Sequence, residues 1–514
     1  IGFIRRDDGI SRCGEGSSHV LTVRWGKCND PKHKDDNLFG VYEGVYTDDI
    51  VKYLEKSKKK YYKILTTPES FQKVKYAFEE LEMSAHCSCF LLFDECHKLV
   101  KDADYRSDIT LPIDDFFKFD QKALVSATPI ELHDPRFKEQ NFQTIEIQPT
   151  FDYKKEIWLH HTNNTLQAFK NVLSKLDNEE VAPLPICVFI NSTDIIYSLM
   201  KQLDLLEESA VFCAPKSVDK LKKNRFCNAY EQWSKDKMKR YNFFTSRFFN
   251  AVDMELEEQP HVIMLTDVYF AEHTMIDPYT DAIQIVGRFR NGVSSITYIS
   301  NTKKGLSQRS KEEIKGYLIC SKEIYRTMKN FYDCATDRAS RDAYRAALES
   351  LPFNRMLDRN GRENWFAIDN YMDEELMKNY FHDENSLYKA YDNCDSFIVY
   401  HAGYYCPLGD SERLKRENKS QSIKDKRKEI VRQLEMLGNC VTEMELEYKW
   451  DLVAADSFIV EAYDTVGKEV IEQLKYSKKK ITEAMIQKQY SEKATGTEVI
   501  RLIKNCYGHH GYGS

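Results

Sequence analysis

Apolar and polar positions along the first 150 residues predict short buried strands that are separated by helices. Residues 62–66, 89–93 and 123–126 are short apolar runs flanked by polar residues, as buried strands often are. Residues 70–83, between the first two runs, place apolar residues at helical spacing. Strands that alternate with helices favour a parallel sheet covered by helices, so we predict an α/β domain over residues 1–150.

The same pattern begins again after a predicted hinge at residues 148–150, which have the sequence Gln-Pro-Thr. A helix is expected at residues 193–205, among several further apolar runs that predict strands. These runs are residues 186–190, 211–213, 241–244 and 262–265. The repeated alternation predicts a second α/β domain with a parallel sheet over residues 151–305.

Beyond about residue 305 the pattern changes to long charged stretches of helix-forming residues, such as residues 311–351 and 423–437. Helix-forming residues over so many consecutive positions predict helices rather than alternating strands and helices. We therefore predict that residues 306–514 form a mainly α-helical region, which follows the two tandem parallel-sheet domains.

The composition is typical of a folded protein rather than a disordered one, with 42% hydrophobic and 12% aromatic residues. A formal net charge of −7 excludes a basic field over the whole molecule, so a nucleic-acid surface would have to be local. No apolar run approaches the ~20 residues that span a bilayer, so no membrane is expected as a partner. Fourteen cysteines without paired metal spacing indicate reduced thiols and a cytoplasmic location.

Two adjacent carboxylates, Asp94 and Glu95, follow the predicted strand at residues 89–93, and His97 comes two positions later. Open α/β sheets bind ligands at the carboxyl ends of their strands. One carboxylate there can hold Mg²⁺ through water, and its neighbour can polarise the attacking water in phosphoryl transfer. The commoner fate of such a pair is a solvated acidic loop, so its neighbours along the chain decide between the two interpretations.

Hydroxyl residues follow two other predicted strands of the first domain. Ser126 and Thr128 lie at the end of the strand at residues 123–126, where small hydroxyl groups can bond the acidic loop. Thr67 and Pro68 follow the strand at residues 62–66 and turn into a helix. Backbone amides and hydroxyls at a helix start suit a phosphodiester backbone, although an ordinary capped helix has the same pattern.

In the second domain, Thr245 and Asp253 are separated by eight positions, and Gln284, Arg288 and Arg290 lie near a predicted helix start. Arginines that reach across a cleft toward a γ-phosphate neutralise the charge that develops in the transition state. A basic turn on the surface is the alternative interpretation of an Arg-x-Arg sequence.

In this order along the chain, these elements resemble the motifs of superfamily-two helicases, the DEAD/DExH-box group of nucleic-acid-dependent ATPases. Asp94 to His97 match the DExH box, and Ser126 to Thr128 match the SAT motif. The other matches are Thr66 to Glu69 with the strand-binding TPx motif, Thr245 to Asp253 with T-x-x-x-x-x-G-x-D (Ala251 replaces the glycine), and Gln284 to Arg288 with Q-x-x-G-R. The resemblance covers about residues 1–300.

The resemblance implies two RecA-like domains that bind ATP and Mg²⁺ between them and a nucleic-acid strand across both. It implies that Asp94 holds Mg²⁺, that Glu95 is the general base for water, and that Arg288 with Arg290 stabilises the γ-phosphate. It also implies that Gln284 contacts the nucleotide and that Thr67, Pro68 and Thr245 contact nucleic acid. The residues implied to couple the nucleotide cleft to the nucleic-acid strand are His97, Gln284, Ser126, Thr128 and Asp253.

The phosphate-binding P-loop of the family has only an imperfect candidate here, at residues 11–18. Gly14 and Gly16 fit G-x-G-K-[ST], and Ser18 occupies the position of the magnesium ligand, but Ser17 replaces the lysine. The loop is therefore degenerate, or the true P-loop lies upstream of the first residue, or another cation replaces the lysine. We favour a degenerate loop, because this sequence precedes Thr66 in the expected order.

A second departure concerns the last arginine of the Q-x-x-G-R-x-x-R motif. The family places it three positions after Arg288, where this chain has Asn291, and Arg290 stands one residue earlier. On a helix one position corresponds to a rotation of about 100°, so Arg290 would need a local adjustment to reach a phosphate.

The sequence thus favours an ATP hydrolase, a helicase or translocase that moves on a nucleic-acid strand, with DNA preferred over RNA. The alternative is a non-catalytic helicase-like scaffold with a dead P-loop, which binds nucleic acid or protein. In either case, the helical region at residues 306–514 is a candidate docking site for a protein partner.

Overall fold

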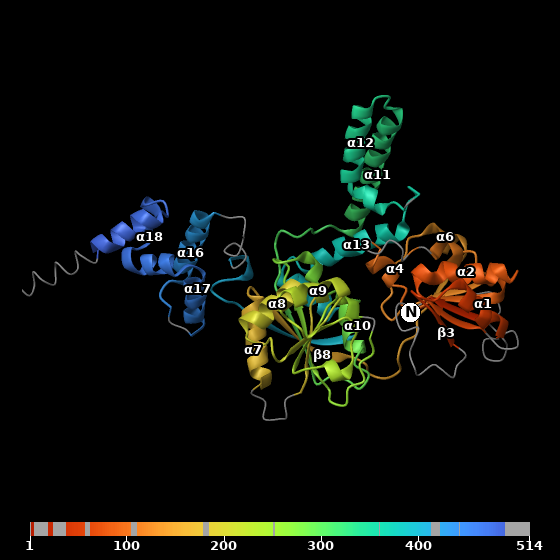
Figure 1. Cartoon of the computed structure of the whole chain (residues 1–514), viewed down its shortest axis with the longest axis horizontal. Coiled ribbons are helices and arrows are strands. Elements are labelled where there is room, and N and C mark those ends of the chain that lie inside the picture. The colour runs from red at the N-terminus through yellow and green to blue at the C-terminus, as the bar shows by residue number, and fades with distance from the viewer. Residues whose placement is uncertain are drawn as a thin grey trace, which may run out of the picture.

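The computed structural model describes the backbone of β1 (Gly2–Ile4) and β2 (His19–Val23) and most of the chain from residue 38 onward. From there the described ranges are residues 38–56, 62–103, 110, 112–177, 184–249, 252–358, 360–412, 422–440 and 443–488. Figure 1 shows two α/β domains side by side, a helical hairpin that projects from them, and a separate helical bundle near the C-terminus.

The first domain contains a seven-stranded sheet in the order β3-β4-β2-β5-β6-β1-β7. Its further strands are β3 (Leu38–Val41), β4 (Lys63–Thr66), β5 (Cys89–Phe93), β6 (Gln121–Val125) and β7 (Gln143–Ile145). The five strands from β3 to β6 in that order are parallel, whereas β1 runs antiparallel to both of its neighbours. The parallel sheet predicted from the apolar runs is therefore confirmed.

Helices of the first domain pack their apolar residues against this sheet, and one buried cluster contains Val74 of α2, Leu91 of β5 and Leu99 of α4. The α-helices are α1 (Thr47–Lys56), α2 (Phe71–Glu80), α3 (Ala85–Ser88), α4 (Lys98–Lys101), α5 (Ile113–Phe116) and α6 (Pro135–Glu139), and η3 (Pro68–Ser70) is a 3₁₀ turn. The helix predicted at residues 70–83 corresponds to α2.

The second domain contains an eight-stranded sheet in the order β11-β10-β12-β9-β13-β14-β8-β15, in which all neighbouring strands are parallel. The strands are β8 (Lys155–Thr162), β9 (Ile186–Phe189), β10 (Ser209–Phe212), β11 (Ala229–Tyr230), β12 (Tyr241–Phe244), β13 (His261–Thr266), β14 (Ser295–Ser300) and β15 (Phe397–Tyr404). The predicted runs at residues 186–190, 211–213, 241–244 and 262–265 all fall on these strands.

Both faces of the second sheet are buried, as is usual for an all-parallel sheet. Along β13, Val262 and Met264 belong to one buried cluster, whereas Ile263 and Leu265 belong to another on the opposite face. The helices of this domain are α7 (Thr165–Asp177), α8 (Thr193–Gln202), α9 (Pro215–Lys223) and α10 (Asp281–Gly287), with 3₁₀ turns η5 (Lys235–Lys237), η6 (Ser246–Phe248) and η7 (Glu272–Thr274).

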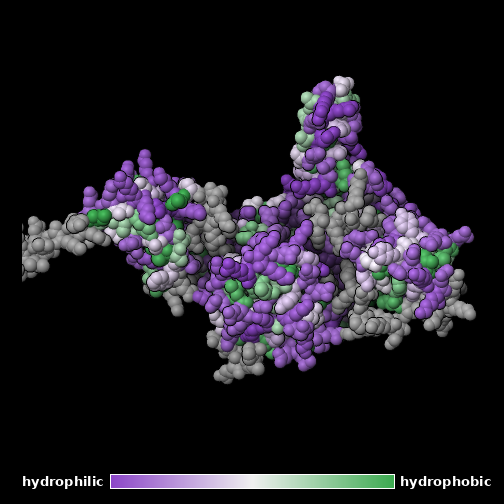
Figure 2. Space-filling view, in the orientation of Figure 1, coloured by the Kyte–Doolittle hydropathy of each residue, from purple (hydrophilic) through white to green (hydrophobic). Residues whose placement is uncertain are grey.

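The region after β14 is mainly helical, as predicted, but it also returns to the second sheet. Helices α11 (Lys311–Cys334) and α12 (Arg338–Ser350) form the projecting hairpin, whose surface is largely hydrophilic in Figure 2. After η8 (Pro352–Met356), α13 (Trp365–Tyr380) and α14 (Glu384–Asp392), strand β15 pairs with β8 over eight residues. The second sheet therefore continues beyond the boundary expected at residue 305.

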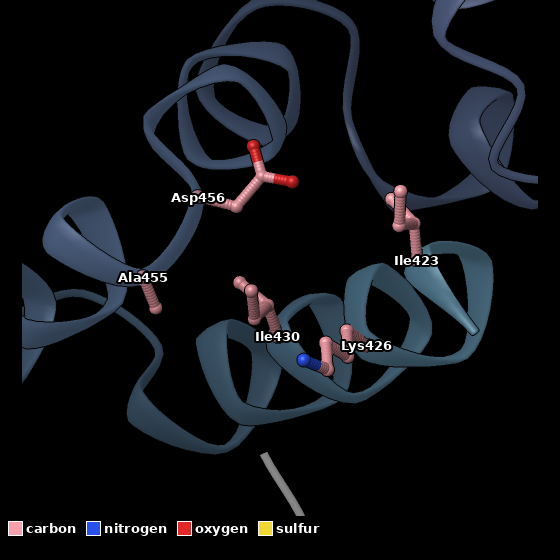
Figure 3. A pocket seen from close by; sticks show the side chains of 5 residues that line it. All are labelled: Ile423, Lys426, Ile430, Ala455 and Asp456. Atoms are coloured by element: carbon pink, nitrogen blue, oxygen red, sulfur yellow. The ribbon is translucent and has the colours of Figure 1, made fainter. Parts of the chain in front are cut away.

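Helices α16 (Ile423–Leu437), α17 (Glu443–Val466) and α18 (Lys468–Gln473) share a buried cluster of their own, together with the helix at residues 478–488. A cavity of about 280 Å³ lies between α16 and α17, where Asp456 breaks α17 (Figure 3). Asp456 accepts a hydrogen bond from the backbone N of Ile459 at 3.3 Å and one from Arg427 Nε at 2.9 Å. Asp456 therefore caps the N-terminus of the second part of α17, and the cavity lies at this break in the helix.

Within the described ranges, no helix combines the length with the apolar composition needed to cross a bilayer.

Candidate active site

The two carboxylates of the DExH-like sequence lie in a tight turn at the carboxyl end of β5. The backbone N of Cys96 donates to Val125 O of β6 at 2.9 Å, which ties the turn to the next strand. Glu95 has a φ of 54°, a left-handed conformation that is uncommon for a residue other than glycine. Its backbone N donates to Asp94 Oδ1 at 3.1 Å. The turn presents the Glu95 side chain, which is 18% exposed, at the edge of the sheet.

His97 connects this turn to the hydroxyl residues after β6. It is 1% exposed, and its Nδ1 lies 2.9 Å from Ser126 Oγ and 3.5 Å from Glu95 Oε2. Ser126 Oγ also accepts a hydrogen bond from the backbone N of Thr128 at 3.0 Å. Burial, together with the smaller effect of the nearby cations of Lys98, Lys101 and Arg288, lowers the pKa of His97 to about 3. His97 is therefore a neutral imidazole at physiological pH.

This burial has a consequence for stability that a His97→Gln variant tests. In the unfolded chain His97 takes up a proton below about pH 6.5, whereas in the folded chain it stays neutral until about pH 3. The free energy of unfolding therefore falls as the pH drops through this window. From pH 6.5 to pH 5 the loss due to His97 is about 2 kcal/mol, which the glutamine variant does not suffer.

The measurement is the free energy of unfolding of both proteins at pH 7 and pH 5 by denaturant titration. Equal losses in the wild type and in His97→Gln would show that the buried imidazole does not carry this pH dependence.

On the second domain, Gln284 and Arg288 come from α10 and its end. Arg288 is buried, and its Nε and Nη2 donate to Gln284 O at 3.1 Å and Gln284 Oε1 at 2.7 Å. Its Nη1 lies 3.5 Å from Asp253 Oδ1. Asp253 reaches this position because the next residue, Met254, forms a parallel bridge with Phe289.

These side chains meet the acidic turn across the boundary between the two domains. Gln284 Nε2 donates to Thr128 Oγ1 at 2.9 Å and lies 3.5 Å from Glu95 Oε2. Arg288 Nη2 lies 3.7 Å from Glu95 Oε1. The structure thus brings together the base candidate, the SAT-like hydroxyl, the glutamine and one arginine, from segments almost 200 positions apart along the chain.

Arg290 occupies a different place from the one that the helical interpretation required. Helix α10 ends at Gly287, so the rotation of 100° per residue does not apply to Arg290, and that part of the prediction is wrong. Its Nη2 donates to Asp253 Oδ1 at 2.8 Å, and half of its side chain is exposed. Of the two arginines, it is Arg288 that lies beside Glu95.

The residues predicted to contact nucleic acid lie at other strand ends and do not join this cluster. The backbone N of Thr67, after β4, donates to Val41 O at 3.2 Å, and buried Pro68 opens η3. Thr245, after β12, donates its backbone N to Phe212 O at 3.1 Å and is 8% exposed. Each is held within its own sheet, at the carboxyl edge, where ligands of α/β sheets bind.

The P-loop candidate, with Gly14, Gly16, Ser17 and Ser18, lies outside the described residues. What the structure does describe is the segment directly after Ser18, which is strand β2, between β4 and β5. A P-loop leads from a strand into a helix, whose first turn carries the lysine and the Ser/Thr. The described part of the chain therefore provides no such helix start after Ser18.

Asp94 is the carboxylate that the helicase resemblance assigns to a magnesium ion. Among the described residues, no three His, Cys, Asp or Glu side chains are grouped as a metal site. Mg²⁺ in nucleotide sites keeps several waters and takes one or two carboxylates together with phosphate oxygens. The carboxylate of Asp94, half-buried at a strand end beside Glu95, fits that mode of binding.

A second contact between the domains was not predicted from the sequence. Lys101 Nζ, on α4, lies 3.1 Å from Asp277 Oδ2 of the second domain and 2.7 Å from Asp373 Oδ2 of α13. Since these partners are far from Lys101 along the chain, no local pattern could have shown the pairing.

No protein-family model matches the chain, and no curated protein matches it in sequence. Solved structures that resemble it include the yeast DEAD-box splicing factor Prp28, with 13% identity, a TM-score of 0.21, and 66% of this chain and 74% of that chain covered. S. cerevisiae Dbp5 bound to RNA and ADP BeF3 has 12% identity, a TM-score of 0.34, and coverage of 72% and 83%.

The ATP-dependent Type ISP restriction-modification enzyme LlaBIII bound to DNA has 10% identity and a TM-score of 0.34, and the match covers 94% of this chain but 37% of that enzyme. Superpositions this weak carry no argument about what the chain binds. The two tandem parallel sheets, with Glu95 and Thr128 of one domain meeting Gln284 and Arg288 of the other, agree with the helicase-like fold that the sequence motifs imply.

Proposed function

We propose that the chain is a nucleic-acid-dependent ATPase of the helicase or translocase type. The observation that carries the proposal is the meeting of Gln284 and Arg288 with Glu95 and Thr128 across the domain boundary. A general base on one domain and an arginine on the other are the parts that phosphoryl transfer between two domains requires.

We assign the chemical roles from the resemblance to helicases, and the positions of the side chains support them. Glu95 accepts a proton from the attacking water, and Arg288 stabilises negative charge on the γ-phosphate. Asp94 would hold Mg²⁺, which when bound would neutralise phosphate charge. Arg290 supports Arg288 indirectly, because both guanidinium groups share the carboxylate of Asp253.

Coupling of the site to a nucleic-acid strand would depend on the hydrogen bonds between the acidic turn and its neighbours. His97 contacts both Glu95 and Ser126, and Thr128 connects the same loop to Gln284. A change around Glu95 therefore shifts groups on both domains. Thr67 with Pro68 and Thr245, at the carboxyl edges of the two sheets, supply the proposed contacts to nucleic acid, with DNA favoured over RNA.

A non-catalytic scaffold is the second candidate function. It is favoured by Ser17 in place of the P-loop lysine and by strand β2 directly after Ser18. Without that lysine and the helix start, a site has fewer groups to hold the β- and γ-phosphates. Such a protein would bind a strand without turning over nucleotide.

Steady-state ATP hydrolysis with Mg²⁺, with and without single-stranded DNA or RNA, separates the two functions. The proposal expects turnover that the strand stimulates. Strand binding without any turnover would contradict the ATPase and leave the scaffold.

A further inference from the structure

Helix α13 belongs to the second domain by its connections but packs on the first domain. The chain leaves the second sheet after β14, forms the projecting hairpin, and returns to the same sheet as β15. Helix α13 belongs to the segment between the hairpin and β15, and Figure 1 shows it running from the second domain to the neighbourhood of α4. The segment between β14 and β15 therefore has both of its ends in the second sheet.

The first turn of α13 is inserted into the core of the first domain. Phe366 and Ala367 are 2% and 8% exposed and belong to the buried cluster of the first sheet. Two residues later, Asp369 accepts a hydrogen bond from the backbone N of His133 at 3.0 Å and lies 2.7 Å from His133 Nδ1. This end of the helix is bound by apolar packing and by a buried polar pair.

The last turns of α13 pack on the second domain. Met377 and Tyr380 contact the buried cluster beneath the second sheet, and the ring of Tyr380 lies 6.0 Å from that of Tyr279. A helix of 16 residues is about 24 Å long, so α13 joins two cores that are separate in the sequence.

Lys101 connects the middle of α13 to both halves of the candidate active site. It ends α4, directly after the acidic turn, and it pairs with Asp373 of α13 and Asp277 of the second domain. Asp281, the first residue of α10, is a third carboxylate beside it. Burial alone would lower the pKa of Lys101, but Asp373, Asp277 and Asp281 raise it well above its usual value.

The lysine is thus a fixed cation among three elements. It follows the turn that carries Glu95, it faces the start of the helix that leads to Arg288, and it holds α13. Removing Asp373 leaves the ion pair of Lys101 with Asp277, but it removes the ion pair that joins Lys101 to α13.

We propose that α13 is a clasp that holds the two domains in fixed apposition, and that Lys101 is the positioning residue that connects the clasp to the site. The effect on turnover rests on the proposed ATPase function, but the apposition itself does not. The clasp keeps Glu95 and Arg288 near each other without nucleotide, so domain opening requires Lys101 or Asp369 to lose its partner.

The test measures the distance between the domains in the full chain by single-molecule fluorescence transfer, without nucleotide. Dyes are attached through unnatural amino acids at Tyr76 of α2 and Gln202 of α8, which are both exposed. The wild type is expected to show one narrow population. The double variant Asp369→Asn/Asp373→Asn is expected to shift the ratio of separated to apposed molecules by about tenfold, as the loss of a charge-assisted hydrogen bond supports.

The matched control is Glu257→Gln/Asp333→Asn, which neutralises two acids in exposed ion pairs with Lys235 and Lys329. It is expected to keep the narrow population. An unchanged distribution in the Asp369→Asn/Asp373→Asn variant would overturn the clasp. If that variant does not fold, Asp373→Asn alone gives the same test, because Lys101 keeps Asp277 but loses its ion pair with α13.

Turnover supplies a second measurement that separates positioning from mere stability. If the chain hydrolyses ATP, Asp373→Asn is expected to lower kcat by about tenfold and to leave KM within about twofold, because it disturbs the approach of Arg288 rather than nucleotide binding. A raised KM with unchanged kcat would overturn the positioning role of Lys101. Absence of turnover in the wild type would contradict the ATPase alone, because the distance measurement uses no nucleotide.

Discussion

Glu95→Gln is expected to lower ATP turnover by about 10²–10⁴-fold, the range that general base catalysis contributes, while nucleotide affinity stays within about twofold. The glutamine retains the size of the side chain and an oxygen for Gln284, but it cannot take the proton of the attacking water. Glu95 occupies a left-handed turn that two neighbouring strands hold, so the change does not remove a packing contact. The measurement is steady-state hydrolysis beside a titration with a fluorescent nucleotide.

The matched control is Glu257→Gln, which makes the same chemical change at an exposed acid paired with Lys235. Its turnover is expected to equal that of the wild type. Full hydrolysis by Glu95→Gln would remove Glu95 as the base, and weakened nucleotide binding with an unchanged rate would give it a binding role instead.

The strands that could be predicted from the sequence are those with nearly unbroken apolar runs. Residues 89–93 and 262–265 are such runs, because strands in the middle of a parallel sheet are buried on both faces. Strand β15 was not predicted, although residues 397–400 are an apolar run, because the surrounding charged, helix-forming stretches indicated a helical region. It forms an edge of the sheet by pairing with β8, which lies far away in the sequence, and no local periodicity carries that information.

The candidate site likewise contains residues that could be predicted from the sequence and contacts that could not. The position of Asp94 and Glu95 at a strand end, beside the loop with Ser126, could be predicted because each lies next to its own apolar run. The contacts of Gln284 and Arg288 with the first domain were expected only through the resemblance to helicases. The pairing of Lys101 with Asp373 could not be expected from either source, because it depends on how α13 packs across both domains.

Arg288→Ala is expected to lower kcat by about 10³-fold or more, the range of an arginine that stabilises the transferring phosphate. The guanidinium is buried, two oxygens of Gln284 orient it, and it lies 3.7 Å from Glu95. Arg290→Ala is expected to cause a much smaller loss, because Arg290 is half exposed and contacts Asp253 rather than the acidic turn. Single-turnover hydrolysis at saturating ATP measures both variants.

Arg288→Lys separates charge from geometry at this position. A lysine keeps the positive charge but loses the planar pair of donors that now contacts Gln284 and Asp253, so it is expected to restore only part of the rate. Arg326→Ala, at an exposed arginine on α11 paired with Glu323, is the matched control and should hydrolyse ATP like the wild type. A larger loss in Arg290→Ala than in Arg288→Ala would reverse the two roles, because the buried arginine would then only orient Asp253 for its exposed neighbour.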